Sequence, residues 1–185
     1  MLTVGLIGAG RIGRVHASTI VQDEGSQLVA VADSVDENAK NFAKLYKVNP
    51  RSVDAIFEDN SIEAILIASS TDTHSDFIEK ASKAGKAILC EKPVDLSLAR
   101  AKRCLENTKS NEHLIMMGFN RRFDPNFVAL KNALDGGEIG TAELLSITSF
   151  DPAPPPIDYV KVSGGIFKDM MIHDFDMANF LYGEL

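Results

Sequence analysis

Two side chains near the end of the sequence have the types and spacing of a proton-transfer pair. Asp169 and His173 lie four residues apart in a mostly apolar stretch, so a helix over residues 164–176 would place both on one face, together with Asp176. We expect that face to look into a cleft, because burying polar groups without partners costs free energy. A carboxylate one turn from an imidazole can fix the tautomer of the ring and stabilise its protonated form.

Two other interpretations of this pair are weaker. A pair on an exposed helix would contribute only roughly a few tenths of a kcal/mol, and the apolar character of the segment argues against exposure. A metal site built on His173 with Asp174 lacks further ligands at a useful spacing. We therefore predict acid–base chemistry and no metal site.

A glycine-rich turn near the beginning of the chain has the spacing of a dinucleotide-binding loop. It follows an apolar run and opens a helical pattern, and its sequence is Gly8-Ala9-Gly10-Arg11-Ile12-Gly13. Gly8 would permit the tight turn, Gly10 would let the backbone approach a pyrophosphate, and Gly13 would let helix and strand pack closely. The helix start would offer free N–H groups to the phosphates. The alternative is that the glycines serve only the fold.

The cofactor predicted for this turn is NAD. Asp33 ends the second predicted strand, 20 residues after Gly13, where its carboxylate would accept hydrogen bonds from the adenosine ribose hydroxyls. The same carboxylate would repel the 2′-phosphate of NADP, and neither of the next two residues is an arginine that would accept it. We therefore expect NAD to be preferred over NADP.

Two more polar segments follow buried strands and so lie at the carboxyl edge of the predicted sheet. In the first, Ser69, Thr71 and His74 are candidates for cofactor contacts, although Thr71 or Asp72 would also suit the N-cap of the next helix.

The second segment is Glu91-Lys92-Pro93, directly after the strand predicted over residues 87–90. A lysine in this place can reach into a cleft, and Pro93 would hold its backbone in an extended or cis conformation. The alternative is a surface loop with an ion pair. We assign Glu91 and Lys92 to the cofactor edge.

Strand-like and helix-like segments alternate over the first 118 residues. Apolar runs typical of buried strands cover residues 3–7, 28–32, 64–68, 87–90 and 114–117. Helical patterns cover residues 12–21, 36–46, 75–84 and 98–108, and Gly85 is placed to end the third of them. Continuous apolar strands separated by helices indicate a parallel sheet covered on both faces. We predict one doubly wound α/β domain, a Rossmann fold, over residues 1–118.

The alternation stops after residue 118. A short helix is predicted over residues 124–136, a strand over 143–150, and a stiff proline-rich loop over 151–156. That loop could instead be a polyproline ligand for another protein, but so short a segment usually only sets the path of a loop. Because a single strand has no sheet to join, we predict an incomplete α+β second domain over residues 119–185.

Composition limits the partners and the compartment. The chain has 19 basic and 26 acidic residues, a net charge of −7 and no basic tract, which argues against nucleic acid and anionic membranes. No apolar run reaches the length of a membrane span, and the first residues lack the zones of a signal peptide. Cys90 and Cys104 fit a reducing cytoplasm better than a disulfide framework. His16 and His113 are expected to be structural or exposed.

Taken in order, the motifs of the chain resemble those of the glucose-fructose oxidoreductase/inositol dehydrogenase/rhizopine catabolism (Gfo/Idh/MocA) family. They are the glycine turn at residues 8–13, Glu91-Lys92-Pro93, Gly118-Phe119-Asn120-Arg121-Arg122-Phe123-Asp124, Gly164-Gly165, and Asp169 to His173. The first motif occurs in many proteins, but the ordered set is specific and covers the whole chain. The likeness is greatest to the myo-inositol dehydrogenases of the family.

The resemblance implies an NAD-dependent oxidation of a ring hydroxyl in a polyol or sugar, most of all myo-inositol to 2-keto-myo-inositol. His173 would accept the hydroxyl proton as hydride leaves, with Asp169 orienting the ring. Lys92 would stabilise negative charge developing on the substrate oxygen. The candidate substrate-binding residues are Asn120, Arg121 and, more weakly, Asp158.

Members of this family are roughly twice as long, and their second half forms an open mixed sheet that walls the substrate site and builds the oligomer interface. The chain retains the cofactor domain and the candidate catalytic segment but lacks most of that sheet. A homo-oligomer is therefore a possible assembly that the resemblance implies. A catalytically silent NAD-binding module acting through a protein partner is a second hypothesis. A related dehydrogenase or reductase with another sugar substrate is a third.

Overall fold

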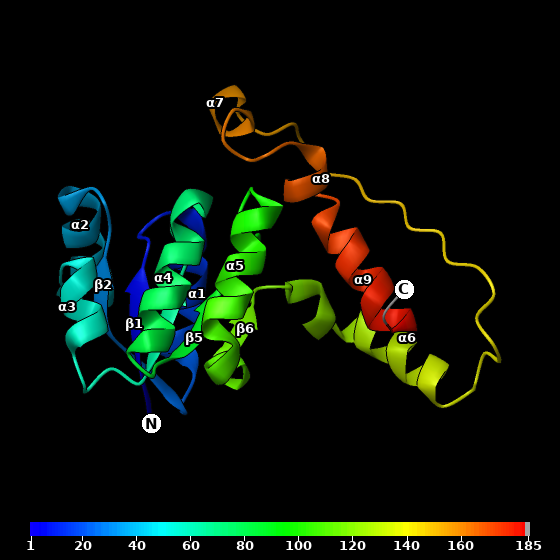
Figure 1. The fold of residues 1–185 in the computed structure, drawn as a ribbon, viewed down its shortest axis with the longest axis horizontal. Helices are drawn as coiled ribbons and strands as arrows, with labels where there is room; N and C mark the ends of the chain where they lie inside the picture. The colour runs from blue at the N-terminus through cyan, green and yellow to red at the C-terminus, as the bar shows by residue number, and fades with distance from the viewer. Residues whose placement is uncertain (184–185) are drawn as a thin grey trace. The chain divides into compact units, whose positions relative to one another are not determined.

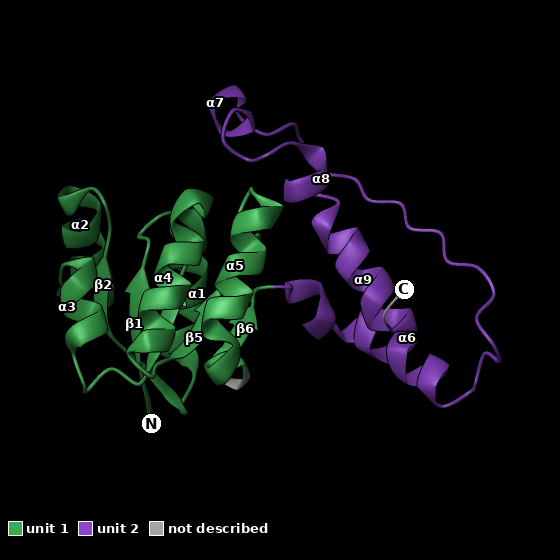
Figure 2. Ribbon diagram, viewed as in Figure 1, with its two compact units in different colours: residues 1–118 green, residues 119–185 purple. Residues whose placement is uncertain are grey.

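The computed structural model describes residues 1–183, apart from the side chain of residue 113 (Figure 1). The chain divides into two compact units, Met1–Gly118 and Phe119–Leu185, drawn in green and purple in Figure 2. The first unit contains every strand of the described chain, and the second contains helices and irregular segments.

The first unit is built on a six-stranded parallel sheet (Figure 1). Its strands are β1 (Leu2–Ile7), β2 (Ser26–Ala32), β3 (Asn49–Pro50), β4 (Ala64–Ile67), β5 (Ala87–Cys90) and β6 (Ile115–Met117). Their order in space is β3-β2-β1-β4-β5-β6, so the strand order reverses between β1 and β4. Open parallel sheets bind ligands at such a reversal, outside the carboxyl ends of the strands.

Helices cover both faces of this sheet. The helices of the first unit are α1 (Arg11–Gln22), α2 (Asp36–Tyr46), α3 (Val53–Glu58), η1 (Thr71–Thr73), α4 (His74–Lys83), α5 (Leu98–Thr108) and η2 (Lys109–Leu114). Successive strand side chains point to opposite faces, so Leu6 and Leu66 pack with α1 and α2, whereas Ile7 and Ile67 pack with α3, α4 and α5. The predicted doubly wound parallel sheet is confirmed.

The sequence located the longer elements of this unit within about two residues of their ends. It missed β3 and α3, because two and six residues are too few to show a periodic pattern. Gly85 follows α4 with a φ of 69°, the left-handed conformation that commonly ends a helix.

The second unit consists of short helices and a long irregular stretch. Its helices are η3 (Asn120–Phe123), α6 (Pro125–Asp135), α7 (Ile157–Val160), α8 (Ile166–Asp169) and α9 (Ile172–Tyr182). Residues 143–150, predicted as a strand, are irregular, and the prediction is wrong. A strand needs a neighbouring strand for its backbone hydrogen bonds, and the described part of this unit contains none.

The segment predicted as one helix, residues 164–176, is two helices separated by residues 170 and 171. The main-chain N–H of Met171 donates to the carbonyl of Ile166, five residues back, and that of His173 donates to Met170, three residues back. Neither spacing is the four-residue repeat of an α-helix, so the helical phase is interrupted. The prediction that Asp169 and His173 share a face of one regular helix is therefore wrong.

Candidate active site

The glycine turn between β1 and α1 has the backbone that a pyrophosphate site needs. Gly8 has a φ of 109°, and a Cβ at this residue would lie 2.3 Å from the carbonyl oxygen of Ala68. A Cβ on Gly13 would lie 2.0 Å from the carbonyl oxygen of Gly8. A Cβ on Gly10, in contrast, would meet no atom of the described residues within 4 Å. The space in front of Gly10 is therefore open, which fits a pyrophosphate lying close to this backbone.

The start of α1 offers the remaining features of an anion site. Gly10 is the N-cap residue, without a side-chain cap, and its carbonyl accepts the main-chain N–H of Arg14 at 3.1 Å. The N–H groups of the first helical residues precede the intrahelical hydrogen bonds and face outward along the axis. They belong to the exposed Arg11, the half-buried Ile12 and the buried Gly13. Together with the positive end of the helix dipole, they suit a phosphate.

Asp33 lies at the end of β2, beside this turn. Its Oδ2 accepts the main-chain N–H of Ala9 at 2.8 Å, and its Oδ1 accepts that of Val35 at 2.9 Å. The Asn38 side-chain amide approaches Oδ1 at 3.4 Å. The carboxylate is half-buried and fixed in orientation, and Oδ2, which accepts the N–H of Ala9, has a further lone pair for a ribose hydroxyl.

The loop after β4 turns directly into two consecutive helices. The side-chain oxygens of Ser69 and Thr73 lie 2.7 Å apart, and the Thr73 hydroxyl donates to the carbonyl of Ser70 at 2.7 Å. Thr73 is the N-cap of α4, so the suggestion that Thr71 or Asp72 caps this helix is wrong. Thr71 is half-buried at the carboxyl end of β4, next to β1 in the sheet.

His74 is buried rather than directed to the surface. The residue is 1% exposed, its Nδ1 lies 2.8 Å from the carbonyl oxygen of Pro93, and its Nε2 lies 3.1 Å from that of Ser69. Both ring nitrogens thus face main-chain carbonyls of the protein. The prediction that this side chain contacts the cofactor is corrected, because it has no exposed polar atom to offer.

Glu91-Lys92-Pro93 follows β5, and the Lys92–Pro93 peptide bond is cis. Glu91 Oε1 lies 2.7 Å from Nε2 of His16, which comes from α1. Burial raises the pKa of the Glu91 carboxyl, but the hydrogen bond and charge of His16, with Lys92, lower it by more, so the net pKa lies below the ordinary range. Glu91 therefore stays ionised beside the half-buried Lys92.

Asp169 and His173 belong to the second unit. The Tyr159 hydroxyl donates to Asp169 Oδ1 at 2.7 Å, so the carboxylate is oriented by a residue ten positions earlier. The Phe119 ring meets the His173 ring edge-on, with centroids 6.3 Å apart and planes at 88°. Both members of the pair are half-buried.

Two ion pairs tie α9 to the short helix η3. Arg121 Nη1 donates to Asp174 Oδ1 at 2.6 Å. Arg122 binds Asp176 through two hydrogen bonds, from Nε to Oδ2 at 2.8 Å and from Nη2 to Oδ1 at 2.6 Å. Asp176, expected to share a cleft-facing surface with His173, is instead buried in this pair, with a side chain only 8% exposed.

The other candidate residues lie in exposed parts of the second unit. Asn120 begins η3, and Asp158 is 93% exposed and pairs with Lys161 at 2.8 Å. Among the described residues, no group of three His, Cys, Asp or Glu side chains is arranged to hold a metal ion. The side chain of His113 lies outside the described part of the chain.

Two protein-family models match the chain. Residues 2–119 match an oxidoreductase family with an NAD-binding Rossmann fold, and residues 127–185 match the GFO/IDH/MocA C-terminal domain. The chain belongs to the Gfo/Idh/MocA family. Its first unit is an NAD-binding Rossmann domain, followed by part of the C-terminal domain of the family. The resemblance found in the ordered motifs is confirmed.

Several relatives within this family are named inositol dehydrogenases. The inositol 2-dehydrogenase of Rhizobium meliloti (strain 1021) is 52% identical over 180 residues, which are 97% of this chain and 54% of that protein. The crystal structure of a myo-inositol dehydrogenase from Corynebacterium glutamicum has a TM-score of 0.93 at 44% identity and covers 98% of this chain and 55% of its own. The scyllo-inositol dehydrogenase of Lactobacillus casei, solved with NAD(H) and scyllo-inositol, has a TM-score of 0.85 at 30% identity, over 99% of this chain and 56% of its own. The chain thus spans about half the length of these family members.

Two partners of the Gfo/Idh/MocA motif residues were not found by sequence reasoning. Tyr159, which binds Asp169, lies in a short helix after the proline-rich loop, where no periodic pattern singles it out. His16 was expected to be structural or exposed, and its pairing with Glu91, 75 residues later, depends on the tertiary fold. Its position three residues after Gly13, on the helix that opens from the glycine turn, was the available signal.

Proposed function

We propose that the chain is the cofactor-binding and proton-transfer part of an NAD-dependent dehydrogenase that oxidises a ring hydroxyl of a polyol, with myo-inositol converted to 2-keto-myo-inositol. The observation that carries the proposal is the open backbone at Gly10 beside the fixed Asp33 carboxylate, in a chain whose relatives are named inositol dehydrogenases. Residues 1–118 supply the cofactor site and residues 119–185 supply part of the substrate domain.

NAD, when bound, would accept the hydride from the carbon that carries the hydroxyl. The chain's own residues handle the proton and the charge. His173 accepts the hydroxyl proton on its imidazole as the carbonyl forms, and Asp169 orients the ring and stabilises the imidazolium. Lys92 stabilises the negative charge that develops on the substrate oxygen. The products of one turnover are a ketone, NADH and one proton.

Cofactor binding divides among three segments in this proposal. The glycine turn, with Arg11 and Ile12 at the helix start, binds the pyrophosphate, and Asp33 binds the adenosine ribose. Ser69, Thr71 and Glu91 line the rest of the cofactor edge at the ends of β4 and β5.

The substrate hydroxyls are assigned to Asn120, Arg121 and Asp158 of the second unit. Arg121 is 29% exposed and already binds Asp174 through Nη1, which leaves its other nitrogens as donors. The Asp158 side chain is 93% exposed and forms a surface ion pair with Lys161, so its carboxylate is accessible to a hydroxyl.

The setting of the enzyme follows from charge and cysteine chemistry. A net charge of −7 repels nucleic acid, and the substrate is a small neutral polyol. Cys90 and Cys104 are buried free thiols, which suits the cytoplasm, and none of the described helices is long and apolar enough to cross a membrane. We also expect a homo-oligomer, formed through the part of the C-terminal domain that this chain does not include.

A coupled pair of measurements tests the proposal. Reduction of NAD is followed by absorbance with myo-inositol, scyllo-inositol and glucose as substrates, and NADH binding is measured by calorimetry on the same protein. Turnover with an inositol and with NAD over NADP is the expected result. NADH binding without turnover of any polyol would instead favour a silent NAD-binding module, and turnover only of glucose would move the proposal to another sugar.

A further inference from the structure

Two consecutive side chains at the start of α4 hold the backbone that follows Lys92. His74 Nδ1 lies 2.8 Å from the carbonyl oxygen of Pro93, and the Ser75 hydroxyl donates to the carbonyl of Val94 at 3.1 Å. His74 and Ser75 are each 1% exposed; the His74–Pro93 contact is buried and the Ser75–Val94 contact is partly buried. Hydrogen bonds in such surroundings resist competition from solvent and fix the main chain they reach.

The same imidazole also reaches the neighbouring strand. His74 Nε2 lies 3.1 Å from the carbonyl oxygen of Ser69, at the end of β4, whereas Pro93 follows β5. One ring therefore joins the carboxyl ends of two adjacent parallel strands. Carbonyl oxygens only accept hydrogen bonds, so a neutral ring donates to one of them and a protonated ring to both. Nδ1, which makes the shorter contact, is the better-placed donor in the neutral ring.

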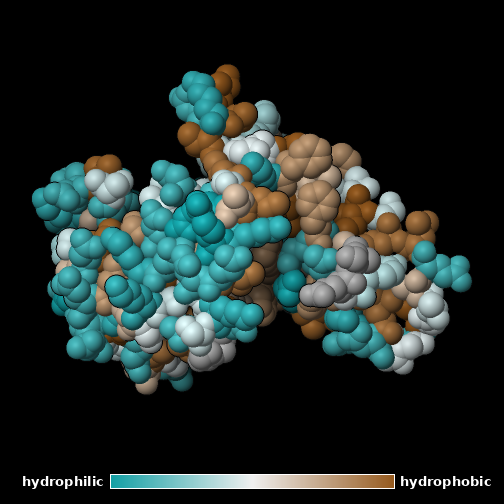
Figure 3. All heavy atoms as spheres, in the orientation of Figure 1, coloured by the Kyte–Doolittle hydropathy of each residue, from teal (hydrophilic) through white to brown (hydrophobic). Residues whose placement is uncertain are grey.

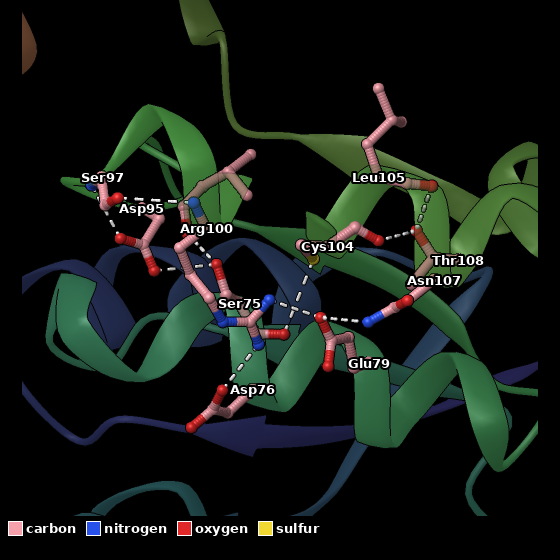
Figure 4. Close-up of polar contacts among 11 residues, drawn as sticks. Ser75, Asp76, Glu79, Asp95, Ser97, Arg100, Cys104, Leu105, Asn107 and Thr108 are labelled. Atoms are coloured by element: carbon pink, nitrogen blue, oxygen red, sulfur yellow. Dashed lines mark hydrogen bonds and ion pairs between the residues drawn. The ribbon is translucent and has the colours of Figure 1, made fainter. Parts of the chain in front are cut away.

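A second set of contacts anchors the far side of the same loop, as Figure 4 shows around Ser75 and Asp95. The Ser75 hydroxyl also lies 2.9 Å from Asp95 Oδ2, and Asp95 Oδ1 accepts the main-chain N–H of Ser97 at 2.8 Å. Ser97 in turn caps α5 by accepting the N–H of Arg100. The loop after Lys92 is thus bound to α4 along its length and runs into a capped helix.

We propose that His74 is a positioning residue for Lys92. Its ring donates to the Pro93 carbonyl and so fixes the main chain directly after Lys92 to α4, which presents the lysine at a defined place at the sheet edge, and Ser75 secures the next two residues. The proposal rests on the function proposed for Lys92. A lysine on a loop needs such support, because a catalytic group displaced by about 1 Å can lose roughly a hundredfold in rate.

Three substitutions at His74 separate the two hydrogen bonds from simple packing. The amide nitrogen of Asn lies near the place of Nδ1 and can donate to Pro93, that of Gln reaches toward the place of Nε2 and Ser69, and Phe fills the space without a donor. His74→Phe and His74→Gln should lower kcat by about 10- to 100-fold with little change in KM for NAD, as for other supports of catalytic groups. His74→Asn should retain kcat within about threefold.

Ser82→Ala is the matched control. Ser82 is a buried serine, 4% exposed, in the last turn of the same helix, where its carbonyl and hydroxyl oxygens accept from Asn111. Its loss should lower the melting temperature and leave kcat unchanged. Equal losses of kcat in the Asn and Phe variants would assign the ring to packing and overturn the proposal, as would wild-type kcat in His74→Phe.

A second readout does not depend on turnover. Reductive ¹³C-methylation gives each lysine an NMR resonance, and comparison with Lys92→Arg assigns that of Lys92. In the wild type this resonance should shift on addition of NADH; the shift should persist in His74→Asn and disappear in His74→Phe. If no polyol is oxidised, the proposed function fails, and this experiment still decides whether His74 positions Lys92. An unchanged shift in His74→Phe would overturn the proposal.

Discussion

The main-chain N–H of Ala9 donates a hydrogen bond to the Asp33 carboxylate at 2.8 Å, which joins the end of β2 to the glycine turn after β1. The other oxygen of Asp33 accepts the N–H of Val35 at 2.9 Å. Both carboxylate oxygens are therefore oriented by the main chain. The residue expected to select NAD also shapes the turn that we propose as the pyrophosphate site.

Replacing this carboxylate should weaken NAD binding and narrow the preference for NAD over NADP. For Asp33→Ser we expect the Kd for NAD to rise about 10- to 100-fold, because hydrogen bonds to a charged group are lost, while NADP no longer meets a negative charge. Titration calorimetry with both cofactors measures the ratio of the Kd values for NAD and NADP. Asp36→Ser, at an exposed carboxylate in the first turn of α2, is the control. An unchanged ratio of affinities in Asp33→Ser would contradict the assignment.

Two glycines of the turn, Gly10 and Gly13, should respond differently to replacement by alanine. Gly10→Ala places its methyl group in open space at a φ of −75°, so we expect the free energy of unfolding to change by less than about 1 kcal/mol. The same methyl group should weaken NADH binding by about 10-fold or more, because it occupies the approach of the pyrophosphate.

Gly13→Ala is the matched comparison, because its Cβ would lie 2.0 Å from the carbonyl oxygen of Gly8. We expect this variant to lose about 2 kcal/mol or more of stability in urea unfolding. Equal NADH affinity for Gly10→Ala and the wild type would show that the open space is not the pyrophosphate site.

Removal of the proposed base should affect chemistry and not cofactor binding. For His173→Ala we expect kcat to fall by about two to four decades with nearly unchanged NAD affinity. Tyr159→Phe removes the 2.7 Å hydrogen bond to Asp169 and should give a smaller loss of kcat of about 10-fold. Steady-state kinetics and calorimetry on the same samples separate the two effects. Retained activity in His173→Ala would remove this residue from the mechanism.

The His16–Glu91 pair should make stability depend on pH in the acid range. Because the net pKa of Glu91 lies below the ordinary range, its carboxylate stabilises the fold above about pH 4 and loses this contribution as the pH falls through the lowered value. The difference in unfolding free energy between the wild type and Glu91→Gln should therefore shrink from about pH 6 to about pH 3.

The control for this pH dependence is Glu24→Gln, at an exposed carboxylate between α1 and β2. In a His16→Ala background, the pH-dependent difference should become smaller, because the His16 hydrogen bond and charge, which lower the pKa of Glu91 against the effect of burial, are lost. Urea unfolding at several pH values is measured on the wild type, the two single Glu variants, His16→Ala and the double variant His16→Ala/Glu91→Gln. A Glu91→Gln effect that does not vary with pH would exclude the pair as its source.

Removing Arg122 should destabilise the fold more than removing Asp176, although the two residues form one ion pair. Arg122→Gln leaves Asp176 buried with a side chain 8% exposed, and we expect a loss of about 3 kcal/mol. Asp176→Asn leaves the Arg122 guanidinium, which is 41% exposed and can bind water. We therefore expect the free energy of unfolding to fall by only about 1 kcal/mol. Hydrogen exchange of α9 amides measures both. A larger loss of stability in Asp176→Asn than in Arg122→Gln would contradict this prediction.

The sequence predicted the first unit well because its elements are long, periodic and bounded by clear turn signals. The two opposite faces of the sheet are both apolar, one rich in isoleucine and the other rich in leucine, and each requires a layer of helices. The ordered motifs also identified the family. Residues 143–150 show the opposite case, because a strand pattern becomes a strand only beside a partner, which the pattern does not contain.

The positions of individual polar side chains were harder to predict. His74 is buried because Pro93, 19 residues later in the chain, supplies a carbonyl at its ring, and Asp176 is buried because Arg122, 54 residues earlier, supplies a charge. Neither partner is visible from local spacing. The roles of Lys92, Asp169 and His173 remain predictions that the experiments above address.

Because α8 and α9 are separate helices, the backbone of residues 170 and 171 sets the relative orientation of Asp169 and His173. In a three-residue turn each residue rotates about 20° further around the axis than in an α-helix, and in a five-residue turn it rotates less, so changes at Met170 and Met171 turn one side chain relative to the other. The relative orientation of the two helices can therefore be changed without replacing Asp169 or His173. Substitutions at Met170 and Met171 offer a way to adjust the angle between the carboxylate and the imidazole while keeping both.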